Sequence, residues 1–544
     1  MNIEELRSSI EGEVSSDAAE LERDSVDASI FRVTPQAVAY PKGVEDLKKL
    51  VAFARVKKRA SDNVSLTARS AGTDMSGGPL NESVIVDFTK YFNRIHEVGN
   101  NYAVVEPGVY YRDFEKATLK KGLLLPSYPA SREICTVGGM VANNSGGEKT
   151  LAYGKTEDYV QELHVVLSDG NEHILNPLVR KELDEKMKQS SFEGEVYRKM
   201  FELLEKNYED IKNAKPNVSK NSAGYFLWNV WDKKTFDLTK LFVGSQGTLG
   251  FVTKIRFRLV PTKEYSRLVV IFLKDLAPLT RLVEEVLKFK PESFESFDDN
   301  TFKLAMKFLP DIMKRMKGNA FLLGFQFLPE LFMVLRGGVP KLILLAEVTS
   351  DSEIEVEERG RALEEAVKQF GVRTRLIRRS SEAKKYWVMR RESFSLLRQH
   401  IHNKHTAPFI DDFIVRPERL SEFLPRLNTI LDPYRNRLIY TIAGHVGDGN
   451  FHIIPLMNLK EPQDRELIPR LMEAVNSLVL EFGGSITAEH NDGLIRSPYL
   501  KRMYGEKIYG LFEEVKRIFD PDNIFNPGKK VGSDIDYTMR HIKT

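Results

Sequence analysis

The sequence predicts a protein of mixed helix and strand that is divided into at least two domains. Its 544 residues are more than one hydrophobic core usually serves, and roughly two to four domains are expected at this length. Strand-like and helix-like segments alternate from about residue 37, and a second alternation begins after Lys263. Lys263 therefore marks the expected boundary between a front half and a rear half.

The periodicity of apolar residues predicts the main elements in order. Residues 1–31 form a charged, helical lead-in, and Val44–Ala60 is an amphipathic helix with Leu47, Leu50, Val51 and Ala54 on one face. Residues 176–213 are charged and helix-prone, and we expect a helical insertion there rather than a core element. Further strands are expected within 65–74, 83–89, 102–109, 241–261 and 266–273, and further helices within 112–122 and 275–289.

Composition excludes several classes of protein. The 80 basic and 77 acidic side chains give a formal net charge of +3, which offers no electrostatic case for binding nucleic acid. The single cysteine, Cys135, can form neither an internal disulfide nor an iron–sulfur cluster, so a reducing, cytoplasmic setting is expected. The polar, acidic N-terminus is not expected to be a signal peptide.

The longest apolar stretch is Asn319–Val348, and polar or breaking residues interrupt it at Gln326, Pro329, Glu330 and Arg336. It is too broken to span a bilayer. We expect buried core followed by a strand at Lys341–Val348. The alternative is a surface that touches the inner face of a membrane or a partner subunit.

Four glycine-rich turns stand out in the front half, at Ala68–Leu80, Val105–Val109, Thr136–Val160 and Gly244–Gly250. None is the G-x-G-x-x-G fingerprint of a Rossmann domain. Because glycine has no Cβ, backbone N–H groups in such turns can approach an anion closely and wrap it. A single turn of this kind is usually only structural, but several in one domain indicate a long ligand with a pyrophosphate.

Histidines concentrate in the rear half, where six of the ten lie between residues 400 and 490. Ala443–His452 places His445 and His452 around a Gly-Asp-Gly turn, and Thr487–Tyr499 adds Glu489 and His490. Two imidazoles and a carboxylate suit a zinc-type ion with an open position, at which a substrate hydroxyl would lose its proton more easily. The spacing alone leaves open an alternative in which these histidines only hydrogen-bond around a turn.

Taken in order, these segments resemble those of the FAD-linked oxidase family, which is related to vanillyl-alcohol oxidase, D-lactate dehydrogenase and the glycolate oxidase flavin subunit. Arg69–Asp74 matches a pyrophosphate loop of the form R-x-x-G-T/S, although Ser70-Ala71 replaces commoner glycines. Thr136 opens a T-x-G-G-x-x-x-x-N-x-G-G match, and Tyr153 opens Y-G-x-x-x-D-x-V. Gly244–Gly250 matches with Gln246 in place of the usual Glu, and Phe519–Lys530 matches the closing F-D-P-x-x-x-x-N-P-G-K.

The resemblance implies FAD as the cofactor, held noncovalently because the pyrophosphate loop has neither His nor Cys. Cys135 directly precedes Thr136, and it is expected to be a buried filler, with a thiol near the flavin as the alternative. The cofactor-binding residues that the resemblance implies are Arg69, Ser70, Ala71, Gly72, Thr73, Asp74, Pro107, Thr136, Gly138, Gly139, Asn144, Gly146, Gly147, Tyr153, Gly154, Asp158, Gly247, Thr248 and Asn526.

For the rear half, the resemblance implies a substrate site. Gly444–His452 matches the family's G-H-x-G-D-G-N-x-H, and Glu489–Gly493 matches its later E-H-G-D-G. Carried over, His445, His452 and Glu489 are ligands of a divalent metal, His490 is the general base and Asn450 is a neighbour of the substrate. Asn491 stands where the family usually has Gly. A W-x-x-R element selects Arg390 for the substrate carboxylate, with Arg391 as the fallback. Ile410 replaces a lysine found in some 2-hydroxyglutarate enzymes, so a second carboxylate on the substrate is less expected. His400, His402 and His405 are expected to form a solvated cluster, or else an adventitious metal site.

The implied architecture is α+β, with a two-subdomain FAD-binding domain of the p-cresol methylhydroxylase type (PCMH-type) over 32–262. A cap domain with an antiparallel, ferredoxin-like sheet follows over 263–525, and residues 526–544 return to the FAD-binding domain. The implied activity is oxidation of a small 2-hydroxy acid, resembling D-lactate or glycolate, by hydride transfer to flavin. Electrons would then leave to a quinone, an electron-transfer protein or O2. The alternatives are an FAD enzyme acting on another alcohol or on an ether lipid, a catalytically silent flavin-binding subunit of an electron-transfer complex, and a metal-dependent hydrolase.

Overall fold

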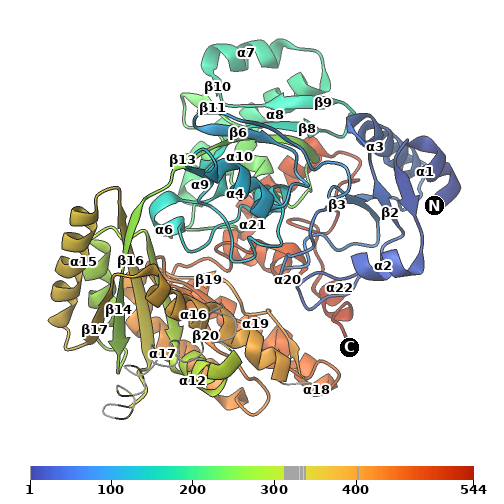
Figure 1. Ribbon diagram of the computed structural model, residues 1–544. Helices are drawn as coiled ribbons and strands as arrows, with labels where there is room; N and C mark the ends of the chain where they lie inside the picture. Colours follow the sequence, from blue (N-terminus) through green and yellow to red (C-terminus); the bar gives the residue numbers. More distant parts are fainter. Residues whose placement is uncertain (1, 312–329, 331, 333–334, 336–337, 401–403) are drawn as a thin grey trace.

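The computed structural model describes residues 2–311, 330, 332, 335, 338–400 and 404–544, without the side chains of 392–400. Figure 1 shows a front part, in blue, cyan and green, above a rear part that runs from green through yellow to orange. The last helices, in red, lie back against the front part. Among the helices of these described ranges, none is long and apolar enough to cross a membrane.

The first front subdomain is built on a four-stranded sheet in the order β1-β2-β4-β3. Its strands are β1 (Glu13–Ser15), β2 (Ala37–Tyr40), β3 (Leu66–Arg69) and β4 (Val84–Asp87). The pairs β2·β4 and β3·β4 are parallel, and α3 (Val44–Arg59) connects β2 to β3. Strand β1 pairs with β2, so the N-terminal lead-in contributes to this sheet as well as supplying α1 (Ile3–Ser9) and α2 (Ala18–Asp24).

The second front subdomain is an antiparallel sheet in the order β5-β6-β12-β8-β9. Its strands are β5 (Ile95–Val98), β6 (Tyr102–Val105), β8 (Val160–Val166), β9 (Glu172–Leu175) and β12 (Phe251–Arg258). The segment at 176–213 is helical as predicted, with α7 (Arg180–Lys188), α8 (Phe192–Lys206) and α9 (Tyr208–Asn213). However, α8 buries Val196, Met200 and Leu203 in the core of this subdomain, so the segment is part of the core.

The rear part is a cap domain on one seven-stranded antiparallel sheet, ordered β17-β14-β16-β15-β20-β21-β19. Strands β14 (Tyr265–Leu273), β15 (Ser293–Asp298), β16 (Leu342–Ser350) and β17 (Arg373–Ile377) lie in the order four-one-three-two, as in a ferredoxin-like fold. Strands β20 (Ile442–His445), β21 (Asn450–Ile453) and β19 (Phe413–Ile414) extend the sheet beyond β15. β16 confirms the strand predicted near Lys341–Val348, whereas most of the preceding apolar stretch lies outside the described residues.

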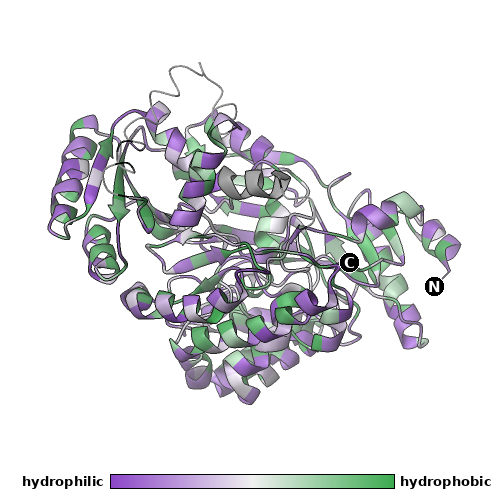
Figure 2. Cartoon of the chain, turned by 90° about the horizontal axis from the view of Figure 1, so that it is seen from below, coloured by the Kyte–Doolittle hydropathy of each residue, from purple (hydrophilic) through white to green (hydrophobic). Residues whose placement is uncertain are grey.

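Helices cover both faces of the cap sheet, which explains why its strands are apolar without alternation. Val269 and Ile271 pack toward α11 (Leu279–Leu287) and α15 (Glu353–Lys368). Leu268 and Val270 face the side covered by α12 (Asp299–Lys307) and α16 (Ser380–His400). Figure 2 shows hydrophilic and hydrophobic residues side by side on the peripheral helices, as expected for helices with one buried face.

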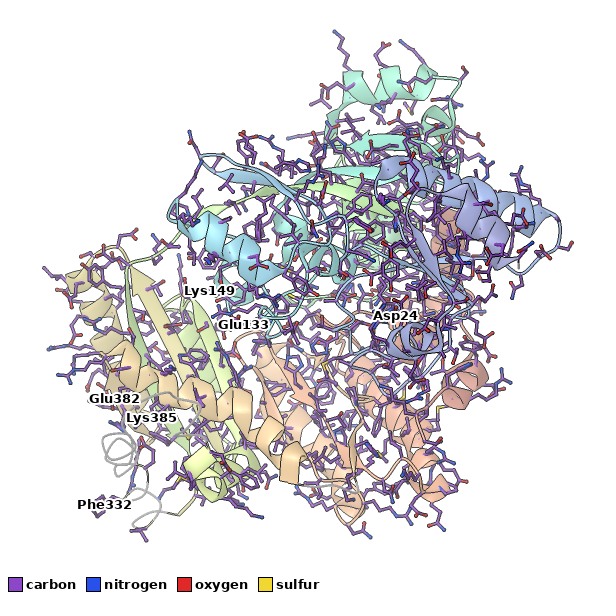
Figure 3. All side chains as sticks on the ribbon, turned by 45° about the vertical axis from the view of Figure 1, so that its right-hand side comes forward. Asp24, Glu133, Lys149, Phe332, Glu382 and Lys385 are labelled. Atoms are coloured by element: carbon purple, nitrogen blue, oxygen red, sulfur yellow. The ribbon has the colours of Figure 1, made fainter. Side chains whose placement is uncertain are left out.

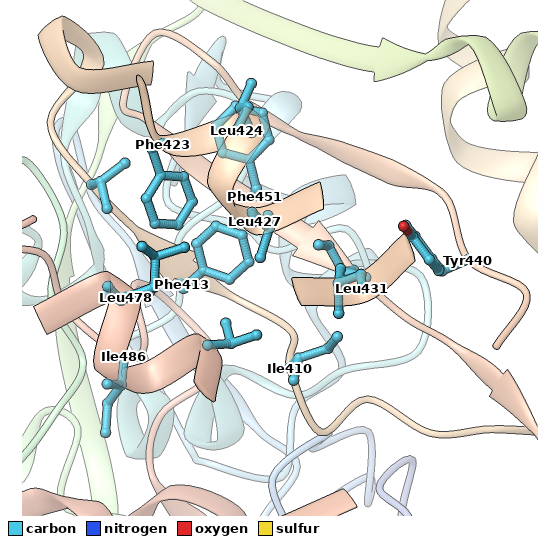
Figure 4. Close-up of a cluster of buried hydrophobic side chains, with 14 of the residues drawn as sticks. Ile410, Phe413, Phe423, Leu424, Leu427, Leu431, Tyr440, Phe451, Leu478 and Ile486 are labelled. Carbon is cyan, nitrogen blue, oxygen red and sulfur yellow. The ribbon is translucent and has the colours of Figure 1, made fainter. Parts of the chain in front are cut away.

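An aromatic cluster anchors the strands that carry the histidines (Figure 4). The ring of Phe413 lies 5.4 Å from that of Phe423 on α17 (Leu420–Leu431) and 6.3 Å from that of Phe451 on β21. Leu478 of α19 (Leu467–Glu481) belongs to the same core. This packing holds β19 and β21 rigidly, and the residues just before β19 with them.

The C-terminal segment returns to the front part before residue 526. Helix α21 (Leu500–Phe519) buries Phe512, Val515 and Phe519 in the core of the second front subdomain. Phe525 then forms a parallel bridge with Leu66 at the edge of β3. The structural return therefore begins near residue 500, earlier than the predicted boundary.

Candidate active site

A cavity of about 750 Å³ lies between the front subdomains and the cap, and both halves line it. Lys149 and Glu133 lie where the two parts meet (Figure 3). Glu133 lines the cavity, and Lys149 joins the front part to the cap through an ion pair of 2.6 Å with Glu292. The volume falls within the range of about 300–1,000 Å³ that small-molecule sites usually occupy.

The cavity brings together most of the residues that the sequence selected. From the front part it is lined by Arg69, Ser70, Gly72, Thr73, Asp74, Pro107, Gly138, Gly139, Gly146, Gly147 and Gly247. From the cap and the returning segment it is lined by Arg390, His445, His452, Glu489 and His490. The glycine turns and the histidines, which are far apart in the sequence, therefore face one space.

Other predicted residues do not line the cavity; these are Ala71, Thr136, Asn144, Tyr153, Gly154, Asp158, Thr248, Asn526 and Asn450. Several of them hold the lining segments in place. Thr136 caps α5 (Val137–Asn143) by accepting from the N–H of Gly139 at 3.2 Å. Asn526 donates to the carbonyls of Gly78 and Gln246 at 2.9 and 2.8 Å, and so ties two glycine turns together from behind.

The hairpin β20–β21 positions His445 against two carboxylates. His445 Nδ1 lies 2.6 Å from Glu295 Oε1, and His445 Nε2 lies 3.0 Å from Glu489 Oε1. Glu489 Oε1 also accepts from the fully buried ammonium of Lys220 at 2.9 Å, which in turn lies 3.1 Å from Asp448. Burial lowers the pKa of His445, but Glu295 and Glu489 raise it, to about 9.

Asp411, directly before β19, orients the other two imidazoles. Its Oδ1 lies 3.1 Å from Nδ1 of His452, and its Oδ2 lies 2.7 Å from Nδ1 of His490. The two rings are stacked, with centroids 5.0 Å apart. An ionised carboxylate can only accept, so His452 carries its proton on Nδ1, toward Asp411 Oδ1. His490 Nδ1 and Asp411 Oδ2 lie at ion-pair distance without the geometry of a hydrogen bond. In both rings Nε2 is the atom left for a ligand or a base.

Asp412 shapes the turn that carries Glu489 and His490. Its Oδ2 accepts from the N–H groups of Ala488, Glu489 and His490 at 2.7–2.9 Å. Burial lowers the pKa of His490, but Asp411 and Asp412 raise it, to about 9. Burial raises the pKa of Asp411, yet the two imidazoles lower it well below its usual range, so this carboxylate stays ionised.

Arg390 and Arg391 both line the cavity, but they have different partners. Arg390 Nη2 contacts Glu295 Oε2, while its buried Nε has no hydrogen-bond partner in the described part of the chain. Arg391 Nη2 pairs with Glu148 of the front part. Arg390 therefore keeps a donor that an anionic ligand can use, whereas Arg391 forms a contact between the two parts.

Two family models match this chain: "FAD binding domain" over residues 35–176 and "FAD linked oxidases, C-terminal domain" over residues 262–530. The matched ranges contain the glycine turns up to Gly154 and the cap with its histidines. The chain belongs to the FAD-linked oxidase family. Both family domains thus occur in this one chain.

Named relatives share this organisation. D-2-hydroxyglutarate dehydrogenase of Pseudomonas putida is 29% identical over 97% of this chain, but the chain spans only 51% of that protein. Glycolate oxidase subunit GlcD of Bacillus subtilis is 27% identical, over 93% of this chain and 90% of that one. The solved structure of p-cresol methylhydroxylase superposes with a TM-score of 0.67 at 15% identity, covering 98% of this chain and 96% of that one. This likeness confirms the predicted PCMH-type fold.

The glycine turns of the front part fit a dinucleotide. A Cβ added at Gly139 would lie 3.0 Å from Ser70 Oγ, and one at Gly138 would lie 2.4 Å from Pro107 Cβ. Glycine thus leaves a narrow space between the 69–74 turn and α5, where backbone groups can approach a phosphate. The Arg69 guanidinium lies 3.1 Å from Asp24 and donates to the Val26 carbonyl, so it braces the N-terminal segment.

The cap residues also fit a divalent cation. One ligand atom from each of His445, His452 and Glu489 lies within 4.8 Å of the others, and His₂Glu is a known ligand set for catalytic zinc. Two of these candidate ligands, His445 Nε2 and Glu489 Oε1, contact each other directly at 3.0 Å. Asp411 forms a second such group with His452 and His490.

The remaining predicted residues have structural positions. Asn450 donates to Asp412 and to the carbonyl of Phe413, both at 3.1 Å. Asn491 adopts a φ of +68°, a backbone conformation that glycine favours and Asn tolerates. This explains why Asn can stand where the family usually has Gly. Cys135 is buried and lines the cavity, and burial raises the pKa of its thiol to about 12. Ile410 is in the core, His405 is exposed, and the side chains of His400 and His402 lie outside the described residues.

Sequence reasoning missed four buried charged residues of the site: Glu295, Asp411, Asp412 and Lys220. The Asp411–Asp412 pair interrupts an apolar run from Phe409 to Val415, which is a recognisable signal because unpaired buried carboxylates are costly. Glu295 lies inside the short strand β15 and carries a weaker signal of the same kind. Lys220 has no such signal in the sequence.

Proposed function

We propose that this FAD-linked oxidase converts a 2-hydroxy acid of the D-lactate or glycolate type to the corresponding 2-oxo acid. A single observation carries the proposal: one cavity joins the glycine turns to an arginine with a free donor, a His₂Glu set and an oriented imidazole. The names of the relatives, D-2-hydroxyglutarate dehydrogenase and glycolate oxidase subunit, support the substrate class.

The chain's own residues divide the work. Arg390 would bind the substrate carboxylate, for which a planar guanidinium is well suited. His490 would remove the hydroxyl proton with Nε2, since its Nδ1 is held by Asp411. When bound, FAD supplies the two-electron acceptor for the hydride that leaves C2 of the substrate. The substrate thus loses one proton to His490 and one hydride to the flavin, and the product is the 2-oxo acid.

A divalent cation of zinc type on His445, His452 and Glu489 would supply positive charge beside the substrate hydroxyl. The same charge favours a neutral imidazole at His490, whose pKa is otherwise raised to about 9 by the surrounding carboxylates. Asn450 would act indirectly, because it donates a hydrogen bond to Asp412, which holds the turn of Glu489 and His490.

The electrons require an external acceptor, for which we propose a quinone, an electron-transfer protein or O2. A relative that is named as a subunit favours a partner protein among these. The buried, protonated Cys135 is compatible with a reducing, cytoplasmic location, and contact with the inner face of a membrane stays a prediction.

The decisive experiment is anaerobic titration of the purified yellow protein with D- and L-2-hydroxy acids, including lactate, glycolate and 2-hydroxyglutarate. An uncharged polyol serves as the control substrate. We expect one enantiomeric series to bleach the flavin and the polyol to leave it oxidised. Bound FAD that no hydroxy acid reduces would instead support a catalytically silent subunit, and equal bleaching by the polyol would remove the role of Arg390.

A further inference from the structure

One buried carboxylate connects Arg390, proposed to bind the substrate carboxylate, to His445, proposed to hold the cation. Glu295 Oε1 lies 2.6 Å from Nδ1 of His445, and Glu295 Oε2 contacts Nη2 of Arg390. The Glu295 side chain is 1% exposed. It therefore links the arginine proposed for the substrate carboxylate to a histidine proposed for the cation beside the substrate hydroxyl.

The cap sheet holds this link rigidly. Strands β15 and β20 pair with Ser296 opposite Gly444, and continuing this register places Glu295 beside His445. Helix α16, which carries Arg390, packs on the same face of the sheet, where Phe297 contacts the cluster of Tyr386 and Met389. Sheet, helix and carboxylate thus leave little freedom in the spacing between Arg390 and His445.

We propose that Glu295 is a positioning residue that sets this spacing and thereby selects 2-hydroxy acids over 3-hydroxy acids. In a 2-hydroxy acid the carboxylate carbon is bonded directly to the carbinol carbon, whereas one further carbon separates them in a 3-hydroxy acid. Because one carboxylate contacts both anchors, we expect them to suit the shorter separation. The inference rests on the proposed function.

Burial makes a purely structural role for Glu295 a poor explanation. Removing a carboxylate from water is costly, and an apolar residue of similar size often serves stability equally well. Each oxygen of Glu295 instead meets one partner, with Oε1 at His445 Nδ1 and Oε2 at Arg390 Nη2. A buried carboxylate kept between these two partners points to a role in positioning.

Two variants of Glu295 separate its length from its charge. Glu295→Gln keeps the length and one acceptor for His445, but it turns an NH2 group toward the Arg390 guanidinium. Glu295→Asp keeps the charge but is one methylene too short to hold both partners. The matched control is Glu357→Gln on α15, where the partly buried carboxylate also pairs with arginines of the cap, Arg267 and Arg361.

The assay compares D-lactate with D-3-hydroxybutyrate, by anaerobic flavin reduction in each protein. Both Glu295 variants should lower the ratio of kcat/KM for the 2-hydroxy acid to that for the 3-hydroxy acid by at least about tenfold. Most of the change should be in KM for D-lactate, and Glu357→Gln should leave the ratio unchanged. A Glu295 variant that keeps FAD and the wild-type ratio overturns the proposal.

A binding measurement provides a readout without turnover. Oxalate places its oxygens at the spacing of a 2-hydroxy acid, and malonate is one carbon longer. The flavin absorbance shift should report tighter binding of oxalate than of malonate to the wild type, and a smaller preference in the Glu295 variants. Equal binding of the two anions by the wild type overturns the proposal even if the variants do not fold. A wild type that no 2-hydroxy acid reduces, but that prefers oxalate, instead removes the proposed function alone.

Discussion

The role of Asp411 is open to a sharp test through the substitution Asp411→Asn. The wild-type carboxylate accepts a hydrogen bond from Nδ1 of His452 at 3.1 Å and forms an ion pair of 2.7 Å with Nδ1 of His490. An amide offers one oxygen and one NH2 group, so only one of the two imidazoles keeps an acceptor. The other ring must move its proton to Nε2, which is the atom that would bind a cation or take the substrate proton.

The size of the effect follows from these contacts. Loss of a carboxylate that orients metal-binding or catalytic histidines typically costs about 10–100-fold in metal affinity or activity. Because Asp411 serves two rings at once, we expect the upper end, about 100-fold, in the rate of flavin reduction by D-lactate. Asp411 is buried and does not line the cavity, so FAD content should be unchanged.

The assay is anaerobic stopped-flow reduction of the flavin, run beside metal analysis and thermal melting. Asp464→Asn is the matched control, because Asp464 is a buried aspartate of the same domain that pairs with Arg437, away from the cavity. An Asp411→Asn protein with full FAD content, a normal melting temperature and a reduction rate within about threefold of wild type would refute the orienting role.

Three further predictions address the arginines, the cation and a charged site remote from the cavity. Arg390→Met should raise KM and lower kcat for hydroxy acids, so that kcat/KM falls at least about 100-fold. Arg391→Met should change kcat/KM less than tenfold. If steady-state kinetics show the larger loss for Arg391→Met, the role belongs to Arg391. Removal of divalent cations with a chelator should abolish flavin bleaching by hydroxy acids while FAD stays bound. Added Zn²⁺ or Mn²⁺ should restore the bleaching. Bleaching by a cation-free protein would exclude a role for the cation in the reaction. Burial lowers the pKa of His173, but Asp169 and Glu193 raise it, to about 9, so its stabilising charge is fully present below pH 6.5 and fades as the pH rises through about 9. His173→Gln should therefore reduce the free energy of unfolding in urea by about 1–2 kcal/mol at pH 6 and by little at pH 10, and a pH-independent loss would contradict the assignment.

The sequence by itself determined the local elements and the chemical types of the site. Apolar periodicity located α3, β14 and β16, and the glycine turns and clustered histidines identified the segments that line the cavity. These features are local, because side-chain direction repeats every 2 residues in strands and every 3.6 in helices, and because glycine marks close backbone approach wherever it occurs.

Only the tertiary structure decided which charges meet and which predicted residues face the cavity. Glu295 and His445 are 150 positions apart, and Lys220 and Glu489 are 269 apart, so no local pattern pairs them. Thr136 and Asn526 match cofactor motifs, yet they do not line the cavity and instead form hydrogen bonds with backbone groups of the segments that do. Burial makes each such pairing energetically significant, and burial is a property of the packed chain and not of any single segment.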